Sequence, residues 1–127
     1  MEICVLLSIK PEFVDRIFDG SKLFEFRRKV FRDRSVKTIV VYATAPVSQV
    51  VGEFDIEEII EGDVIGLWEL TKEHSGIAKE HFDKYFSGLE IGFAIRIGET
   101  RIYDVPLDLN SEFSVMHPPQ SFIYIRQ

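Results

Sequence analysis

Three charged residues, Lys22, Glu25 and Arg27, stand close together in residues 20–27, Gly-Ser-Lys-Leu-Phe-Glu-Phe-Arg. The alternating pattern predicts a strand over residues 22–29, with its two phenylalanines facing a core and Glu25 and Arg27 sharing the opposite face. A guanidinium offers planar, paired donors to a phosphate or a base edge, and the neighbouring carboxylate could accept from an amino group. The alternative is an exposed ion pair that contributes roughly 0–1 kcal/mol to stability.

Lys10 and Lys22 flank a predicted helix and could converge at one end of the fold. An ammonium there would suit a phosphate. If it lost its hydration its pKa would fall, and it could act as a general base. The alternative, which the residues support equally, is two solvent-facing lysines.

Four polar residues fall on or next to predicted strand ends, where they could line the mouth of a pocket: Tyr42, Thr44, Gln120 and Ser121. The amide of Gln120 could hydrogen-bond a base edge. The alternative for the hydroxyl groups is local capping and turn hydrogen bonding.

A basic loop with an aromatic residue inside it follows the first motif, at Arg28, Lys29, Phe31, Arg32 and Arg34. Base stacking on an aromatic ring beside phosphate-neutralising charges is typical of single-strand binding. We therefore treat this loop as a candidate nucleic-acid surface. The alternative is that Phe31 packs into the core and the charges are simply hydrated.

Charge is distributed unevenly along the chain. The whole chain carries −6, whereas residues 10–37 hold nine basic and five acidic residues, a local charge of +4. This distribution favours a localised anion site over attraction across the whole surface.

A length of 127 residues with 46% hydrophobic content predicts one globular domain over residues 1–127. No membrane helix or signal peptide is evident, so we expect a cytoplasmic protein without membrane contact.

Metal or cofactor binding is not predicted. The three histidines, His74, His81 and His117, lack the usual ligand spacing, and Cys4 lies on an apolar strand. Cys4 is therefore expected to be an unreactive core thiol.

Hydrophobic periodicity and turn residues predict a mixed α+β fold of six or seven strands. The expected strands cover residues 3–9, 22–29, 38–44, 47–60 with a bend at Gly52, 92–98, 101–105 and 121–125, the fifth and sixth joined as a hairpin by Gly98-Glu99-Thr100. A helix is expected between Pro11 and Gly20, and two more after an Asp63 cap and over residues 77–86.

Five blocks in this order resemble the ASCH domain family. They are Ser-Ile-Lys-Pro at 8–11, the segment at 20–27, Tyr-Ala-Thr-Ala-Pro-Val at 42–47, Val-Gly-Glu-Phe at 51–54, and Pro-Pro-Gln-Ser-Phe-x-Tyr at 118–124. The chain looks like the small stand-alone members from archaea and bacteria.

The resemblance implies a PUA-like small β-barrel of about six strands, with a helix after the first strand and a helical insertion near residues 63–87. It also implies a cleft beside the first helix. Some family members remove the acyl group of N4-acetylcytidine with a lysine, a threonine and a glutamate. That lysine corresponds to Lys22, the threonine position holds Glu25, and Glu73 is a candidate for the glutamate.

The leading hypothesis is an RNA- or nucleotide-binding module with a polar cleft beside the second strand. The alternative is a small metal-independent nucleoside amidohydrolase that uses Lys22 and a nearby carboxylate, Glu25 or Glu73. With the resemblance, the Glu25–Arg27 pair is expected to line the site. A protein–protein module is a third possibility. The sequence leaves open whether the protein is an enzyme.

Overall fold

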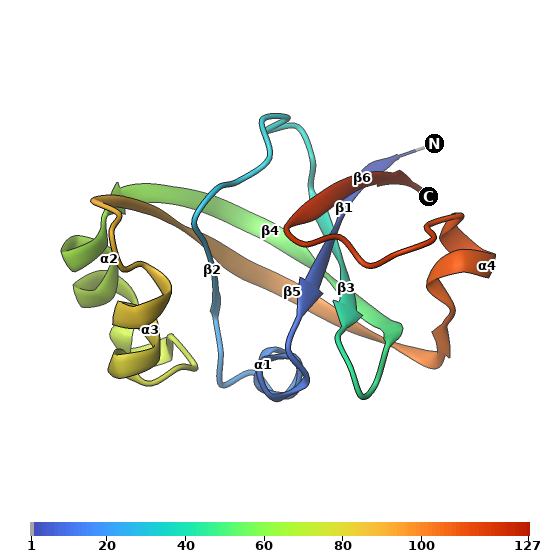
Figure 1. Cartoon of the computed structure of the whole chain (residues 1–127), viewed down its shortest axis with the longest axis horizontal. Helices are drawn as coiled ribbons and strands as arrows, with labels where there is room; N and C mark the ends of the chain where they lie inside the picture. Colours follow the sequence, from blue (N-terminus) through green and yellow to red (C-terminus); the bar gives the residue numbers. More distant parts are fainter. Residues whose placement is uncertain (1) are drawn as a thin grey trace.

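The computed structural model describes residues 2–127 (Figure 1). The elements in chain order are β1 (Ile3–Ile9), α1 (Pro11–Phe18), β2 (Phe24–Arg27), β3 (Thr38–Ala43), β4 (Gln49–Asp63), α2 (Val64–Thr71), the 3-10 helix η1 (Lys72–His74), α3 (Lys79–Tyr85), β5 (Ile91–Leu107), α4 (Leu109–Phe113) and β6 (Phe122–Arg126).

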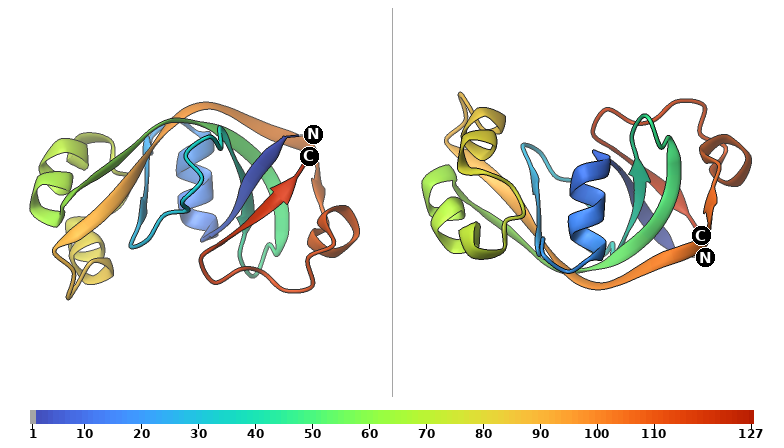
Figure 2. Two further views of the ribbon diagram at one scale, coloured as in Figure 1. Left: turned by 90° about the horizontal axis from the view of Figure 1, so that it is seen from above. Right: turned by 90° about the horizontal axis from the view of Figure 1, so that it is seen from below.

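The strands form one mixed sheet in the order β2-β5-β4-β3-β1-β6. Within residues 2–127 only β1 and β3 pair in parallel, and α1 and β2 provide the long connection that a parallel pair requires. The sheet curls around α1, which lies against its concave face (Figure 2). Val14 and Ile17 of α1 pack there in a core that includes Leu7, Phe54 and Ile95. The mixed α+β fold is therefore confirmed.

The expected closed barrel does not form, because β2 and β6 are the two outer strands and do not pair with each other. Strand β2 ends at Arg27 and is too short to pair with β6. Contacts from β2 and from the loop that follows it span the gap between these two strands instead. Arg27 Nη2 donates to the Ser121 carbonyl oxygen at 2.9 Å, and the Phe31 ring lies 5.9 Å from the Phe122 ring. The Tyr124 hydroxyl accepts from the backbone N–H of Asp33 at 3.1 Å.

The hairpin predicted over residues 92–105 is wrong, since β5 is one continuous strand of 17 residues. It pairs with β4 along most of its length, and the ladder absorbs shifts of register near Ile56. Gly98 lies beside Asp55 in this irregular region instead of in a turn. The bend expected at Gly52 is confirmed by a register shift between Val50 and Gly52 in the pairing with both β3 and β5. A Cβ there would lie 2.7 Å from the Phe18 ring, so only glycine lets α1 approach so closely.

The helical insertion begins as predicted, with the Asp63 carboxylate accepting from the Gly66 N–H at 2.7 Å. Inside it, Phe82 and Phe86 pack against Phe24 and Phe26, which confirms that both phenylalanines of β2 face a core. Helix α4 was not predicted, although Asp108 caps it by accepting from Ser111 N–H.

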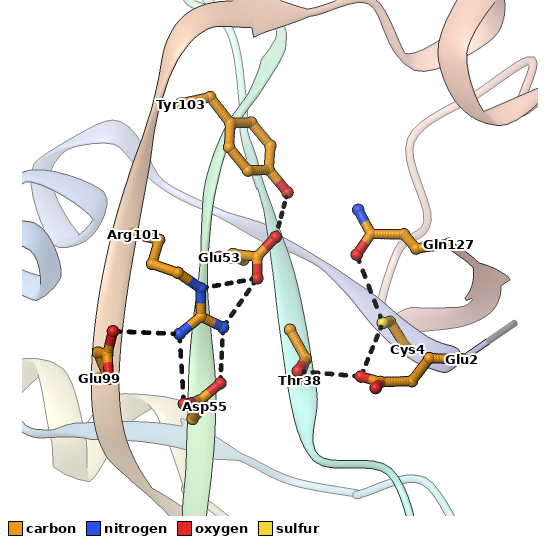
Figure 3. A network of polar contacts seen from close by, with 9 residues as sticks. All are labelled: Glu2, Cys4, Thr38, Glu53, Asp55, Glu99, Arg101, Tyr103 and Gln127. Atoms are coloured by element: carbon orange, nitrogen blue, oxygen red, sulfur yellow. Dashed lines mark hydrogen bonds and ion pairs between the residues drawn. The ribbon is translucent and has the colours of Figure 1, made fainter.

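Strands β4 and β5 are also joined by charged side chains (Figure 3). The Arg101 guanidinium donates to Glu53 Oε2 at 2.8 Å and to Asp55 Oδ1 at 2.6 Å, and the Tyr103 hydroxyl donates to Glu53 Oε1 at 2.8 Å. In a separate group of contacts nearby (Figure 3), the Cys4 thiol lies 3.8 Å from Glu2 Oε1 and 3.7 Å from Gln127 Oε1, and burial, followed by the negative charge of Glu2, raises the pKa of this thiol to about 11. Cys4 therefore stays protonated at neutral pH, in agreement with an unreactive thiol.

None of the helices within residues 2–127 has the length and hydropathy needed to cross a membrane.

Candidate functional site

A cavity of about 440 Å³ opens where the end of β1, α1, β2 and α3 meet. Its lining includes Ser8, Ile9 and Lys10 from the β1–α1 junction, Phe13 from α1, Lys22, Glu25, Phe26 and Arg27 from β2 and the turn before it, Thr44 after β3, Ile77, His81 and Tyr85 from the insertion, and Pro118, Pro119 and Gln120 before β6. Its volume is in the range of small-molecule sites, enough for one nucleotide and too small for a duplex.

Lys22 is the most deeply buried charged side chain of the cavity, with 1% of its surface exposed. Its ammonium group donates to the Ser75 carbonyl oxygen at 2.7 Å. It lies 5.3 Å from the centre of the Phe13 ring and 4.9 Å from that of Phe26, so two aromatic faces replace much of its hydration.

The turn that holds Lys22 requires a glycine at position 76. Gly76 has φ +69°, and a Cβ on it would lie 2.4 Å from the Lys22 Cβ. The Ser75 hydroxyl donates to the Ile77 carbonyl oxygen at 3.1 Å and stabilises the same turn. The insertion is therefore shaped to cover the stem of this lysine.

Loss of hydration lowers the pKa of Lys22 to about 8. The negative charge of Glu25 opposes this change, and the positive charge of Arg16 adds to it. A lysine with this pKa holds a proton most of the time at neutral pH and is still neutral in a useful fraction of molecules. It can therefore transfer protons in the physiological range.

Glu25 and Arg27 form a partly buried ion pair at the same cavity, with Arg27 Nη1 3.2 Å from Glu25 Oε2. Their side chains are 9% and 11% exposed, so the exposed-pair alternative is wrong. Within residues 2–127 every fully buried side-chain oxygen has a hydrogen-bond partner. The second Glu25 oxygen has none and therefore keeps some exposure. Because Glu25 lines the cavity, that oxygen is available to a ligand donor.

The structure brings six of the eight predicted ligand-binding residues to the cavity wall: Lys10, Lys22, Glu25, Arg27, Thr44 and Gln120. The 118–120 segment is held there by the Ser8 hydroxyl, which donates to the Pro119 carbonyl oxygen at 2.8 Å. Ser121 contributes its backbone oxygen to Arg27 instead of a hydroxyl group to the cavity. Tyr42 was placed wrongly, because its side chain packs in a separate core with Leu6 and Val40.

Glu73 is also outside the cavity. Glu73 lies on η1 with its side chain exposed to solvent, so the prediction that it acts together with Lys22 at one site is wrong. The insertion contributes His81 and Tyr85 instead. These two residues are four positions apart on α3, and that helical spacing was the one sequence signal that could have identified them.

The predicted basic loop lies next to the cavity. Arg28 Nε donates to the Tyr85 carbonyl oxygen at 2.7 Å, and its guanidinium lies 4.7 Å from the centre of the Tyr85 ring. Lys29, Arg32 and Arg34 are exposed. Phe31 is 1% exposed and packs in the main core, because it fills the gap between β2 and β6, so the prediction that it stacks on bases is wrong.

The chemistry of these groups is that of an anion and base-edge site. Arg27 offers further N–H donors, Lys10 and Lys22 add positive charge, and Glu25 supplies an acceptor. Neutral and charged forms of Lys22 are both accessible, so the cavity could also transfer a proton.

No protein-family model matches the chain. An ASCH domain-containing ribonuclease from Zymomonas mobilis is 32% identical over 124 residues, which is 96% of this chain and 84% of that protein. The crystal structure of the ASCH protein of Zymomonas mobilis superposes with a TM-score of 0.88 at 31% identity, over 97% of this chain and 87% of that one. Large ribosomal subunit protein uL22 of Ureaplasma parvum is 29% identical over 122 residues, and this chain spans 39% of its length. The identity with the ribonuclease over nearly the whole chain shows that the protein belongs to the ASCH domain family.

Proposed function

We propose that this protein is a ribonuclease that seats one unpaired nucleotide of an RNA strand in the cavity of Lys22, Glu25 and Arg27. The observation that supports this proposal best is that one cavity of nucleotide size holds both the desolvated Lys22 and Arg27, which forms an ion pair with Glu25. The relative from Zymomonas mobilis is named a ribonuclease, which supports the same chemistry.

Recognition of the nucleotide falls to the Glu25–Arg27 pair. Specific readout of RNA usually targets unpaired bases through hydrogen bonds to their edges. The free oxygen of Glu25 accepts from an amino or imino group, and Arg27 donates to a base carbonyl or a phosphate. Because the pair is nearly buried, these bonds form away from bulk water and discriminate strongly between donors and acceptors.

Lys22 acts on the 2′-hydroxyl of the seated nucleotide. In its neutral form it takes the hydroxyl proton, and the 2′-oxygen then attacks the adjacent phosphorus atom. A pKa of about 8 leaves roughly one lysine in ten neutral at pH 7, which is sufficient for a general base. Arg27 and Lys10 offset the negative charge that develops on the phosphate.

The basic loop extends the contact with RNA beyond the cavity. Arg28 is positioned next to Tyr85 at the cavity wall, and Lys29, Arg32 and Arg34 continue the positive charge along the loop. Phosphate contacts of this kind add affinity without sequence preference, and they weaken as salt concentration rises.

The test is cleavage of a short fluorogenic single-stranded RNA by the purified protein. The parent and the control Lys72→Met, which removes an exposed lysine paired with Glu69, are expected to cleave it. Lys22→Met is expected to lose about 10²-fold or more of the rate. A 2′-deoxy residue at the cleaved position should block the reaction. Equal rates for Lys22→Met and the control, or cleavage of the 2′-deoxy substrate, would contradict the proposal.

A second candidate is hydrolysis of an N4-acylated nucleoside at the same cavity. It is favoured by one observation: Lys22 is close enough to Glu25 for the carboxylate to raise the pKa of the lysine. Against it, one oxygen of the Glu25 carboxylate already accepts a hydrogen bond from Arg27, so only the other oxygen is free to bind and orient a water molecule.

A further inference from the structure

RNA cleavage by the 2′-hydroxyl needs two proton transfers. One group accepts the proton of the attacking oxygen, and a second supplies a proton to the leaving 5′-oxygen. The proposed function assigns only the first of these to Lys22, so the cavity should contain a second group on the side where the RNA strand leaves.

Helix α3 presents a suitable side chain at that position. His81 lines the cavity and is itself exposed, which places it at the rim, whereas Lys22 lies at the enclosed end. The two residues contact the same aromatic ring. The His81 ring centre is 5.2 Å from that of Phe13 at an angle of 87°, and the Lys22 ammonium is 5.3 Å from the Phe13 centre.

We propose that His81 is the second catalytic residue of this site and that its imidazolium protonates the leaving 5′-oxygen, an inference that rests on the proposed ribonuclease function. Histidine is the side chain most often used for proton transfer near neutral pH. The contact with Phe13 orients the ring and leaves its nitrogens free, since no hydrogen bond to the His81 side chain occurs within residues 2–127.

The reaction balances without any co-reactant. The 2′-oxygen loses its proton to the neutral amine of Lys22 and forms a bond to phosphorus. The bond between phosphorus and the 5′-oxygen breaks, and that oxygen takes a proton from His81. The products are a 2′,3′-cyclic phosphate and a free 5′-hydroxyl, and solvent returns the proton from Lys22 to His81.

The position of each group decides its role. The nucleotide that carries the attacking hydroxyl is the one seated deep in the cavity, next to Lys22. The following nucleotide must remain outside, because the cavity holds only one, and its 5′-oxygen therefore passes the rim. Tyr85, one helical turn beyond His81, and Arg28 on the Tyr85 ring provide a stacking face and a charge for that outer nucleotide.

Several charged groups act on these two residues. Arg16 of α1 and Glu25 of β2 influence Lys22 in opposite directions, and Lys10 and Arg27 share the cavity wall. Of these cations, Arg16 favours the neutral form of Lys22, and Lys10 and Arg27 attract the phosphate to the cavity.

The experiment compares the pH dependence of cleavage for the parent, His81→Ala and the control His74→Ala, which replaces an exposed histidine outside the cavity. Two substrates are used: an RNA dinucleotide, and the same dinucleotide with sulfur in place of the 5′-bridging oxygen. A thiolate leaves without needing a proton, so the sulfur substrate makes the second proton transfer unnecessary.

With the oxygen substrate, the rates of the parent and His74→Ala should rise up to about pH 8, where Lys22 loses its proton. His81→Ala should be slower than both by about 10²–10³-fold. With the sulfur substrate, His81→Ala should recover to within about tenfold of the parent, whereas Lys22→Met should not recover.

The inference is overturned if His81→Ala matches His74→Ala, or if it loses equal activity on both substrates. If the parent cleaves neither substrate, the proposed function itself fails and this inference fails with it, so the two failures are distinguishable. Because His81 is exposed and its one ring contact is with Phe13, its replacement should lower the melting temperature by no more than about 5 °C, which serves as the check on folding.

Discussion

Replacement of Lys22 by methionine should make the protein more stable at neutral pH and, at the same time, inactive. The folded state holds the Lys22 ammonium away from water and lowers its pKa from 10.5 to about 8. One pKa unit corresponds to about 1.4 kcal/mol, so burial of this charge costs roughly 3 kcal/mol. Methionine has a similar length and carries no charge, so it removes that cost.

Other contacts of Lys22 reduce the net gain. Methionine leaves the Ser75 carbonyl oxygen without the ammonium donor, at a cost of about 1 kcal/mol, and it loses the attraction of the Phe13 and Phe26 rings for a cation. We therefore expect Lys22→Met to raise the free energy of unfolding by about 1–2 kcal/mol at pH 7 and the melting temperature by about 5 °C.

The pH dependence follows from the direction of the pKa change. Between pH 8 and 10.5 the unfolded chain binds more protons at Lys22 than the folded one, so the parent gains stability as pH rises through that interval. The charge penalty that Lys22→Met removes should be full below pH 8 and nearly gone by about pH 10.5, so the advantage of the variant should shrink and be lost within this interval. Other groups titrate in this range, but they are present in both proteins and cancel in the comparison.

Thermal unfolding of the parent, Lys22→Met and Lys72→Met at pH 7 and pH 10 measures this effect. Lys72→Met should follow the parent within about 0.5 kcal/mol at both pH values, because that lysine is exposed. If Lys22→Met is less stable than the parent at pH 7, or if the difference between them does not change with pH, the reasoning about a desolvated lysine is refuted.

Four further predictions concern the same site and its substrate. Glu25→Gln should lower the free energy of unfolding, measured in urea, by more than about 1 kcal/mol, because Arg27 loses its carboxylate partner while its side chain is only 11% exposed. Arg27→Lys should weaken RNA binding, measured by fluorescence anisotropy, because lysine lacks the planar, paired donors of the guanidinium. Parental values in both measurements would contradict the role assigned to this pair. The triple variant Arg28→Ala/Lys29→Ala/Arg32→Ala should bind single-stranded RNA more weakly and reduce the slope of log Kd against log salt by about 2, whereas an unchanged slope would mean that the loop is only hydrated surface. The parent should release little or no cytidine from N4-acetylcytidine, because Glu25 occupies the position of the family threonine; turnover of about 1 s⁻¹ or faster by chromatography would favour the amidohydrolase function.

The parts of the fold that local chemistry determines could be predicted from the sequence. Alternation in residues 24–27, the Asp63 cap and the bend at Gly52 each depend on neighbouring residues, and each was correct. Residues 98–100 have the composition of a turn, but their conformation is decided by β4, which pairs with β5 on both sides of them. The open sheet could not be predicted either, because its outer strands β2 and β6 are joined only by contacts between residues far apart in the chain, such as Arg27 with Ser121.

The candidate site divides in the same way. Residues carried by the β2 motif, Lys22, Glu25 and Arg27, could be assigned because their spacing places them together. The position of Tyr42 could not be predicted, because every residue of β3 is buried and the sequence therefore does not show which face of the strand points toward the cavity. The assignment of Glu73 to the site is wrong, and the sequence analysis does not identify His81. Both errors have one cause: which residues of the insertion face β2 depends on packing in three dimensions.

The contact between the insertion and Lys22 gives the strongest argument that this cavity has a function. A buried lysine without a carboxylate bonded to it lowers stability, and many substitutions would remove that cost. The chain nevertheless places a glycine at position 76, whose positive φ and missing Cβ leave room for the lysine stem, and a carbonyl oxygen at Ser75 to receive its ammonium. Two adjacent residues of the insertion, far from Lys22 in the sequence, thus keep one destabilising side chain in place. Structural requirements alone would be met better by methionine, so the proton of Lys22 is the feature that the fold is built to retain.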